Sequence, residues 1–182
     1  MKLFLLFLLL YTSTTLKAQP TEREIPGRPL HGIKAGIIGL WYSYEKKIDR
    51  QTTFNLEAGW YLTFGGGYYN NSNGIPIFFL APIFEPAIRL EPRWYYNLLK
   101  RYEKGKNIQN YSANYLALTT KFDLQPFFST TPPALRIIPK WGNRRRLGNH
   151  FIFETAIGVG AYIDQDVAFG LPGLDLKFGY IF

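Results

Sequence analysis

The stretch from Phe54 to Gly65 alternates strictly between large apolar side chains and small or polar ones. The apolar positions are Phe54, Leu56, Ala58, Trp60, Leu62 and Phe64, and the residues between them are Asn55, Glu57, Gly59, Tyr61 and Thr63. A period of two predicts a β-strand with one apolar face and one polar face. Strands of soluble sandwiches usually have about five or six residues, whereas a tilted transmembrane strand needs about ten. The length of this alternation therefore favours a strand that spans a membrane.

The same alternation recurs along the chain. It predicts strands at 32–45, 53–65, 83–97, 113–124, 134–142, 150–163 and 173–182. Single-chain barrels of bacterial membranes have an even number of strands. We therefore expect an all-β fold, an antiparallel transmembrane β-barrel of eight strands, with the eighth in Thr21–Leu30 or formed by dividing Pro76–Asn97 at its prolines. The stretch 32–45 has no clean apolar face, which suggests a β-bulge near Gly39.

Length and composition indicate one exported domain. The 182 residues show no break in composition, and the chain has no cysteine, so it offers no disulfide framework and no thiolate metal ligand. Lys2, a short apolar run and the small Ala18 are typical of a secretory signal peptide, which we place at 1–18. The prolines and charges of 19–31 predict an N-terminal lead-in. The barrel domain then covers 32–182.

The chain is basic, with a formal net charge of +8. No nucleic-acid recognition motif accompanies this charge, and we expect no nucleic-acid partner. The basic residues concentrate in three turns. These basic turns are Lys46, Lys47 and Arg50; Lys100, Arg101, Lys104 and Lys106; and Arg144, Arg145 and Arg146. If the long connections 65–75, 125–133 and 164–172 are extracellular, all three turns meet the periplasm, where they would lie near lipid phosphates.

A second set of charges lies on the polar parity of the predicted strands. In an eight-stranded barrel, side chains fill the interior, so these charges would face the lumen and pair with one another. The predicted lumenal charge network comprises Glu57, Glu85, Arg89, Glu91, Arg93, Lys121, Asp123, Glu154, Asp175 and Lys177, with Arg136 and Lys140 on the same parity. One interpretation is that these charges pair with one another and only fill the interior. The alternative is that they line a selective, gated channel.

The aromatic residues and histidines limit the remaining functions. Trp41, Trp60, Trp94 and Trp141 predict aromatic girdles at the two membrane interfaces. His31 and His150 are the two histidines of the chain, and no serine shares the face of His150, so we predict no catalytic site. Two histidines also make a metal site improbable, and no cofactor is expected.

Two stretches carry a resemblance to known proteins. The last nine residues, Leu174 to Phe182, alternate and end on an aromatic residue, and they resemble the closing strand of bacterial outer-membrane β-barrels, which the barrel assembly machinery reads. The stretch Glu91–Asn97, with the basic residues after it, Asn114–Leu116 and Trp141–Gly160, resembles a small and mostly uncharacterised family of such barrels. That family is similar in architecture to the eight-stranded barrels.

The resemblance implies a place in the cell but no reaction. We expect a protein of the bacterial outer membrane that is exported through a cleaved signal peptide and contacts outer-membrane lipids. Its role would be structural or partner-binding, with an extracellular protein as the partner. The alternatives are the small gated channel and a soluble secreted barrel that binds a hydrophobic ligand.

Overall fold

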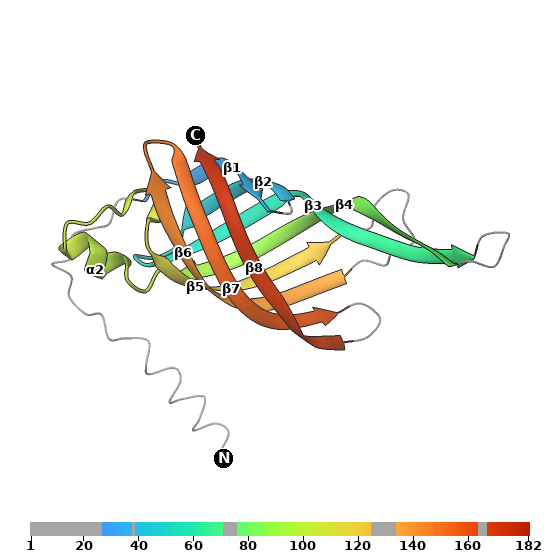
Figure 1. Ribbon diagram of the computed structural model, residues 1–182. Coiled ribbons are helices and arrows are strands. Elements are labelled where there is room, and N and C mark those ends of the chain that lie inside the picture. The colour runs from blue at the N-terminus through green and yellow to red at the C-terminus, as the bar shows by residue number, and fades with distance from the viewer. Residues whose placement is uncertain (1–26, 38, 71–75, 125–133, 164–166) are drawn as a thin grey trace, which may run out of the picture.

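The chain folds into a closed barrel of eight antiparallel strands that neighbour each other in chain order, and β1 pairs with β8 to close it (Figure 1). The computed structural model describes residues 27–37, 39–70, 76–124, 134–163 and 167–182. The strands are β1 (Leu30–Gly36), β2 (Gly39–Lys47), β3 (Thr52–Asn70), β4 (Pro76–Trp94), β5 (Asn114–Asp123), β6 (Ala134–Leu147), β7 (Phe151–Ile163) and β8 (Val167–Ile181). The predicted all-β fold and the number of eight strands are confirmed.

The eighth strand does not lie where the sequence analysis placed it. The predicted strand 32–45 is two strands, β1 and β2, which pair with each other so that Gly36 lies opposite Gly39. The chain reverses between these glycines, and the irregularity read as a bulge near Gly39 is this reversal. Residues 76–94 form the single strand β4, and β1 begins at Leu30, two residues before the predicted barrel. The predicted signal peptide 1–18 lies outside the described residues.

Side chains alternate between the interior and the outer surface of the barrel. On β5, Leu116, Leu118 and Phe122 are exposed, while the intervening residues from Tyr115 to Asp123 are mostly buried. The same parity holds on β8, where Lys177 is buried and Phe178 is exposed. Ile181 breaks the polar parity of β8 because it packs inside the barrel against a small apolar cluster.

The connections gather at two ends of the barrel. One end, which we call the cap end, carries the β2–β3 turn, the β6–β7 turn and the long β4–β5 connection with α2 (Leu98–Glu103) and the short 3-10 helix η2 (Gln109–Tyr111). The other four connections lie at the opposite end. The three basic turns therefore share one end of the barrel. No helix in the described ranges is long and apolar enough to cross a membrane.

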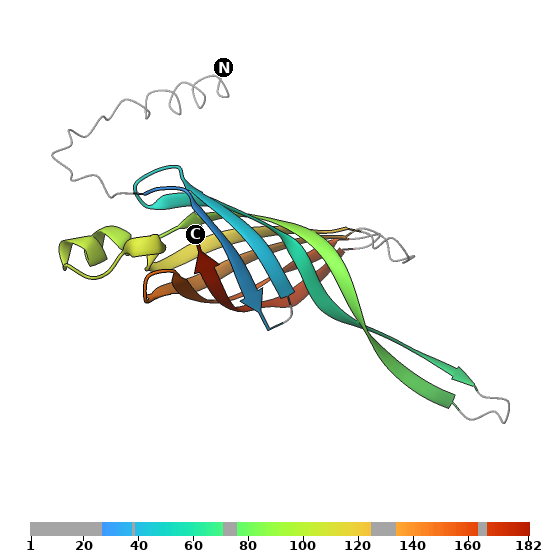
Figure 2. The same cartoon turned by 90° about the horizontal axis from the view of Figure 1, so that it is seen from above.

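The β3–β4 hairpin continues beyond the rest of the barrel, and we name this end of the molecule the hairpin end (Figures 1 and 2). β3 and β4 stay paired out to Asn70 and Pro76. The pairing of β3 with β2 stops at Tyr61, and the pairing of β4 with β5 stops at Ala87. Residues 65–70, expected to be loop, therefore pair with 76–82 in a two-stranded ribbon.

Candidate functional site: the charged interior

Charged side chains from all eight strands fill the interior of the barrel. The ten residues predicted for the lumen lie on the inward parity of their strands, as do Arg136 and Lys140. Those that are almost fully buried are Glu57, Arg89, Glu91, Arg93, Lys121, Asp123, Lys140, Glu154 and Lys177. Alternation places them inside because each neighbouring residue on the same strand turns outward.

Three further interior charges were missed by the sequence analysis. Lys34, Glu45 and Arg144 are each exposed by only 1–2%. Lys34 lies in the stretch that was interpreted as one irregular strand, and Glu45 adjoins the first basic turn. Arg144 was assigned to the third basic turn, which is wrong: β6 runs on to Leu147, so Arg144 still lies within the strand and points inward.

Two arginines and two glutamates form the centre of the interior. Arg93 Nη1 lies 3.1 Å from Glu154 Oε1 and 3.5 Å from Glu45 Oε2. Arg144 Nη2 lies 2.5 Å from Glu45 Oε2, and Arg144 also contacts Glu154 directly. We call these four residues the central cluster. Each guanidinium thus meets both carboxylates of the cluster, and Arg93 also contacts Glu91 directly, so charge and hydrogen bonding are satisfied where the side chains are buried.

Glu57 joins the central cluster to the rest of the interior. Its two carboxylate oxygens lie 3.0 Å from Lys34 Nζ and 2.7 Å from Lys177 Nζ. Arg89 Nη1 is 3.3 Å from Glu57 and 3.2 Å from Asp175. Carboxylates are therefore shared between cations from strands that are distant in the sequence, and the network ties opposite walls of the barrel together.

Neutral polar groups complete the carboxylate shells. Thr53 Oγ1 and Tyr95 OH donate to Glu45 Oε1 over 2.5 and 2.9 Å. Thr119 Oγ1 donates to Glu91 over 2.6 Å, and the Asn55 amide donates to the other Glu91 oxygen over 3.3 Å. Buried charges are stable only when such partners are present, so these residues are part of the network.

A second group of charges lies toward the hairpin end. Asp123 is 2.8 Å from both Lys121 Nζ and Arg136 Nε. Asp175 accepts from Lys140 Nζ over 2.6 Å. Tyr61 OH donates to Glu85, which accounts for the last of the predicted lumenal charges.

Trp41 belongs to this interior group, so its predicted place in an interfacial girdle is wrong. Its side chain is 3% exposed and stacks on Tyr61 at 6.5 Å between ring centroids. The Arg89 guanidinium lies 4.7 Å from the Trp41 ring, in the geometry of a cation–π contact. The misplaced eighth strand and the misplaced Trp41 have the same cause. The sequence analysis did not recognise the chain reversal between Gly36 and Gly39, after which β2 begins. Trp60, Trp94 and Trp141 face outward.

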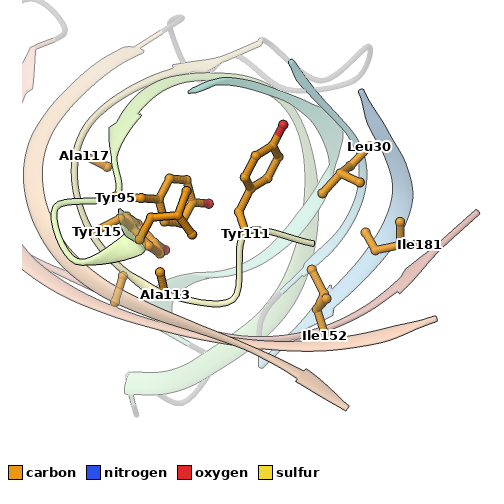
Figure 3. Packing of buried hydrophobic residues seen from close by; sticks show 10 residues of the cluster. Leu30, Tyr95, Tyr111, Ala113, Tyr115, Ala117, Ile152 and Ile181 are labelled. Atoms are coloured by element: carbon orange, nitrogen blue, oxygen red, sulfur yellow. The ribbon is translucent and has the colours of Figure 1, made fainter. Parts of the chain in front are cut away.

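The cap end of the lumen is filled by aromatic and aliphatic side chains (Figure 3). Tyr95 stacks on Tyr111 of η2 at 5.6 Å and packs against Tyr115 at 5.3 Å. Leu30 and Ile152 belong to the same buried cluster. Burial disfavours the phenolate and raises the pKa of Tyr111 to about 12, so this ring stays neutral. The cap lies directly on the central cluster, because Tyr95 binds Glu45.

The histidines have structural environments. His150 stacks on Tyr180 at 5.3 Å, and its Nδ1 lies 3.1 Å from the Ile181 carbonyl oxygen. His31 Nδ1 lies 2.9 Å from Tyr42 OH. Among the residues described, no three His, Cys, Asp or Glu side chains form a group that could hold a metal ion.

The nine remaining residues of the basic turns lie at the cap end in several settings. Lys46, Lys100, Lys104 and Lys106 are exposed, and the others are partly buried. Arg145 donates to Asn114 Oδ1 over 2.8 Å, and Arg146 donates to Asn149 Oδ1 over 3.0 Å.

No protein-family model, curated protein or solved structure matches this chain.

The central cluster predicts a large penalty for removing one charge. Glu154→Gln leaves Arg93, Arg144 and Lys34 short of one carboxylate inside the barrel. We expect the free energy of unfolding to fall by about 3–5 kcal/mol, the usual effect of breaking a buried ion pair from one side. Urea unfolding of the refolded protein, followed by tryptophan fluorescence, measures this. Glu103→Gln on the exposed end of α2 is the matched control, and an equal effect of both changes would contradict the prediction.

Proposed function

We propose that this protein is a β-barrel of the bacterial outer membrane with a structural or partner-binding role. The observation that carries the proposal is the distribution of side chains across the barrel wall: charges lie inside and large apolar residues lie outside. A barrel in water requires the opposite arrangement, since burial of apolar surface stabilises its interior. A barrel in lipid requires the arrangement found here.

The outer surface forms an apolar belt around the strands. Large apolar side chains that are exposed on the strands include Ile33, Leu40, Phe54, Leu56, Phe84, Ile88, Leu116, Leu118, Phe122, Ile157, Val159, Leu174, Leu176 and Phe178. A continuous exposed apolar surface of this kind marks contact with a membrane or another protein. Outer-membrane lipids are the proposed partner of this belt.

Aromatic residues with polar groups lie toward the two ends of the belt. Near the cap end, Trp141 Nε1 donates to Tyr96 OH over 2.9 Å, and Trp94 packs on Tyr96. Trp60 pairs with Leu40, close to the β1–β2 reversal at the hairpin end. This placement is typical of interfacial girdles and supports the membrane proposal for these three tryptophans.

The lumen does not favour the two alternatives. A soluble barrel that binds a hydrophobic ligand needs an apolar cavity, whereas this interior is charged. A gated channel needs a continuous path through the lumen. Here the central cluster fills the lumen, and the buried aromatic and aliphatic side chains of the cap end lie directly on it. The proposal includes no catalytic role.

The three basic turns support an orientation with the cap end in the periplasm. There the exposed lysines would face the phosphates of the inner leaflet, each contributing about 1 kcal/mol near an anionic surface. Export through the predicted signal peptide and insertion by the barrel assembly machinery complete this proposal.

The hairpin end would then face the outside, and the β3–β4 ribbon is the proposed partner-binding surface. Beyond Tyr61 and Ala87, the described pairing leaves the outer edges of both strands without a neighbouring strand. Such edges accept an added strand from another protein.

A charge in the apolar belt tests the membrane proposal. We expect Leu118→Arg, in the middle of β5, to cost about 2–4 kcal/mol in lipid vesicles and to reduce recovery in the outer-membrane fraction. Leu147→Arg at the end of β6 is the matched control, because the same change near the interface costs about 0–1 kcal/mol. Tolerance of both arginines, with the protein in the soluble fraction, would overturn the proposal.

Single cysteines test the orientation, since the chain has none of its own. Ile37→Cys reports on the hairpin end and Lys104→Cys on the cap end, and both positions are exposed. We expect a membrane-impermeant thiol reagent to label Ile37→Cys on intact cells and Lys104→Cys only after permeabilisation. The reverse pattern would invert the orientation.

A further inference from the structure

A cavity of about 130 Å³ lies inside the barrel between the central cluster and the hairpin end. The β1–β2 reversal at Gly36 and Gly39, Gly173 of β8 and the stacked pair of Trp41 and Tyr61 contribute to its wall. A water molecule occupies about 30 Å³ of liquid, so the cavity has room for a few waters or for one small polyatomic ion.

The charged lining of this cavity is predominantly basic. Its cations are Arg89, Lys121, Arg136, Lys140 and Lys177, and its one carboxylate is Asp175. Four further carboxylates lie behind the lining. Asp123 and Glu57 pair with some of these cations, while Glu85 and Glu91 accept hydrogen bonds from the lining residues Tyr61 and Thr119. The surface that an occupant of the cavity would meet is therefore mostly cationic, with five cations and one carboxylate.

The carboxylates near the cavity are each shared. Asp175 serves both Arg89 and Lys140, at 3.2 and 2.6 Å. Asp123 serves both Lys121 and Arg136. Glu57 serves Lys34, Arg89 and Lys177.

In the described part of the chain, Arg89 has a hydrogen-bond donor that lacks an acceptor. Its side chain lines the cavity and is 7% exposed, and its buried Nε–H has no hydrogen-bond partner among the described residues. A guanidinium N–H that is removed from water needs an acceptor. Oxyanions match the planar donor fork of arginine, and several ammonium groups around one site reinforce this preference.

We propose that the cavity is a binding site for a small free oxyanion of the phosphate class. Arg89, Lys121, Arg136 and Lys140 bind its oxygens, and the anion supplies the acceptor that the Arg89 Nε–H needs. The volume suits one tetrahedral ion and leaves no room for a lipid headgroup. The site itself depends only on the barrel interior; that the anion arrives from outside the cell rests on the proposed function.

Titration of the refolded, detergent-solubilised full chain with inorganic phosphate at constant ionic strength tests this proposal. Isothermal calorimetry should show saturable binding with a dissociation constant on the order of 1 mM or below. Chloride at the same ionic strength should not compete. Absence of saturation, or equal displacement by chloride, would overturn the site and leave the membrane proposal untouched, because that proposal is tested separately by Leu118→Arg.

Two substitutions should change the affinity in opposite directions. Arg136→Gln removes one cation of the lining and should weaken phosphate binding by about tenfold, as expected for one lost charge-assisted hydrogen bond. Asp175→Asn removes the competing carboxylate, frees Arg89 and Lys140, and should tighten binding. Lys104→Gln on the exposed cap end is the control and should leave binding unchanged. Equal affinities in all variants would identify an adventitious ion only and overturn the proposal.

Discussion

The pairing of charges inside the barrel is the interaction on which the rest of this structure depends. A lone charge removed from water is costly, and the interior of an eight-stranded barrel must be filled by side chains. Glu57 and Glu154 meet this constraint by collecting cations from several strands. The same contacts fix the relative positions of the strands, because Lys34 of β1 and Lys177 of β8 reach one carboxylate across the seam that closes the barrel.

The charges fill the interior of the barrel, and the large apolar side chains of the strands lie on its outer face. Within the closed wall, each strand is paired on both sides, and the β3–β4 ribbon extends beyond this wall. Pairing of the backbone groups within the wall is what a barrel in lipid requires. The ends of the lumen then differ. Aromatic residues of the β4–β5 connection cover the central cluster at one end, while the other keeps a basic cavity.

Much of this architecture could be predicted from the sequence, because successive side chains of a strand point to opposite faces and a period of two therefore shows which residues share the interior. The parity of β3, β5, β7 and β8 placed Glu57, Lys121, Glu154 and Lys177 correctly in the lumen. The errors arose where local signals were weak. Gly36 to Gly39 reverses the chain with isoleucine between glycines and without Asn, Asp or Pro, so the turn was missed and Trp41 was assigned to the wrong face. Arg144 sits in a run of three arginines that resembles a turn, yet its interior position depends on Glu45 and Glu154, which only the folded barrel brings near.

Depth-resolved quenching of single tryptophans tests the inside-out division most directly. In four variants, each retaining one tryptophan with the others replaced by Phe, the protein is refolded into vesicles that carry lipid-bound quenchers at defined depths. We expect the lipid probes to quench Trp60, Trp94 and Trp141, whereas Trp41, which is 3% exposed inside the barrel, should not be quenched at any depth. Quenching of Trp41 equal to that of the other three would contradict the charged-interior barrel described here.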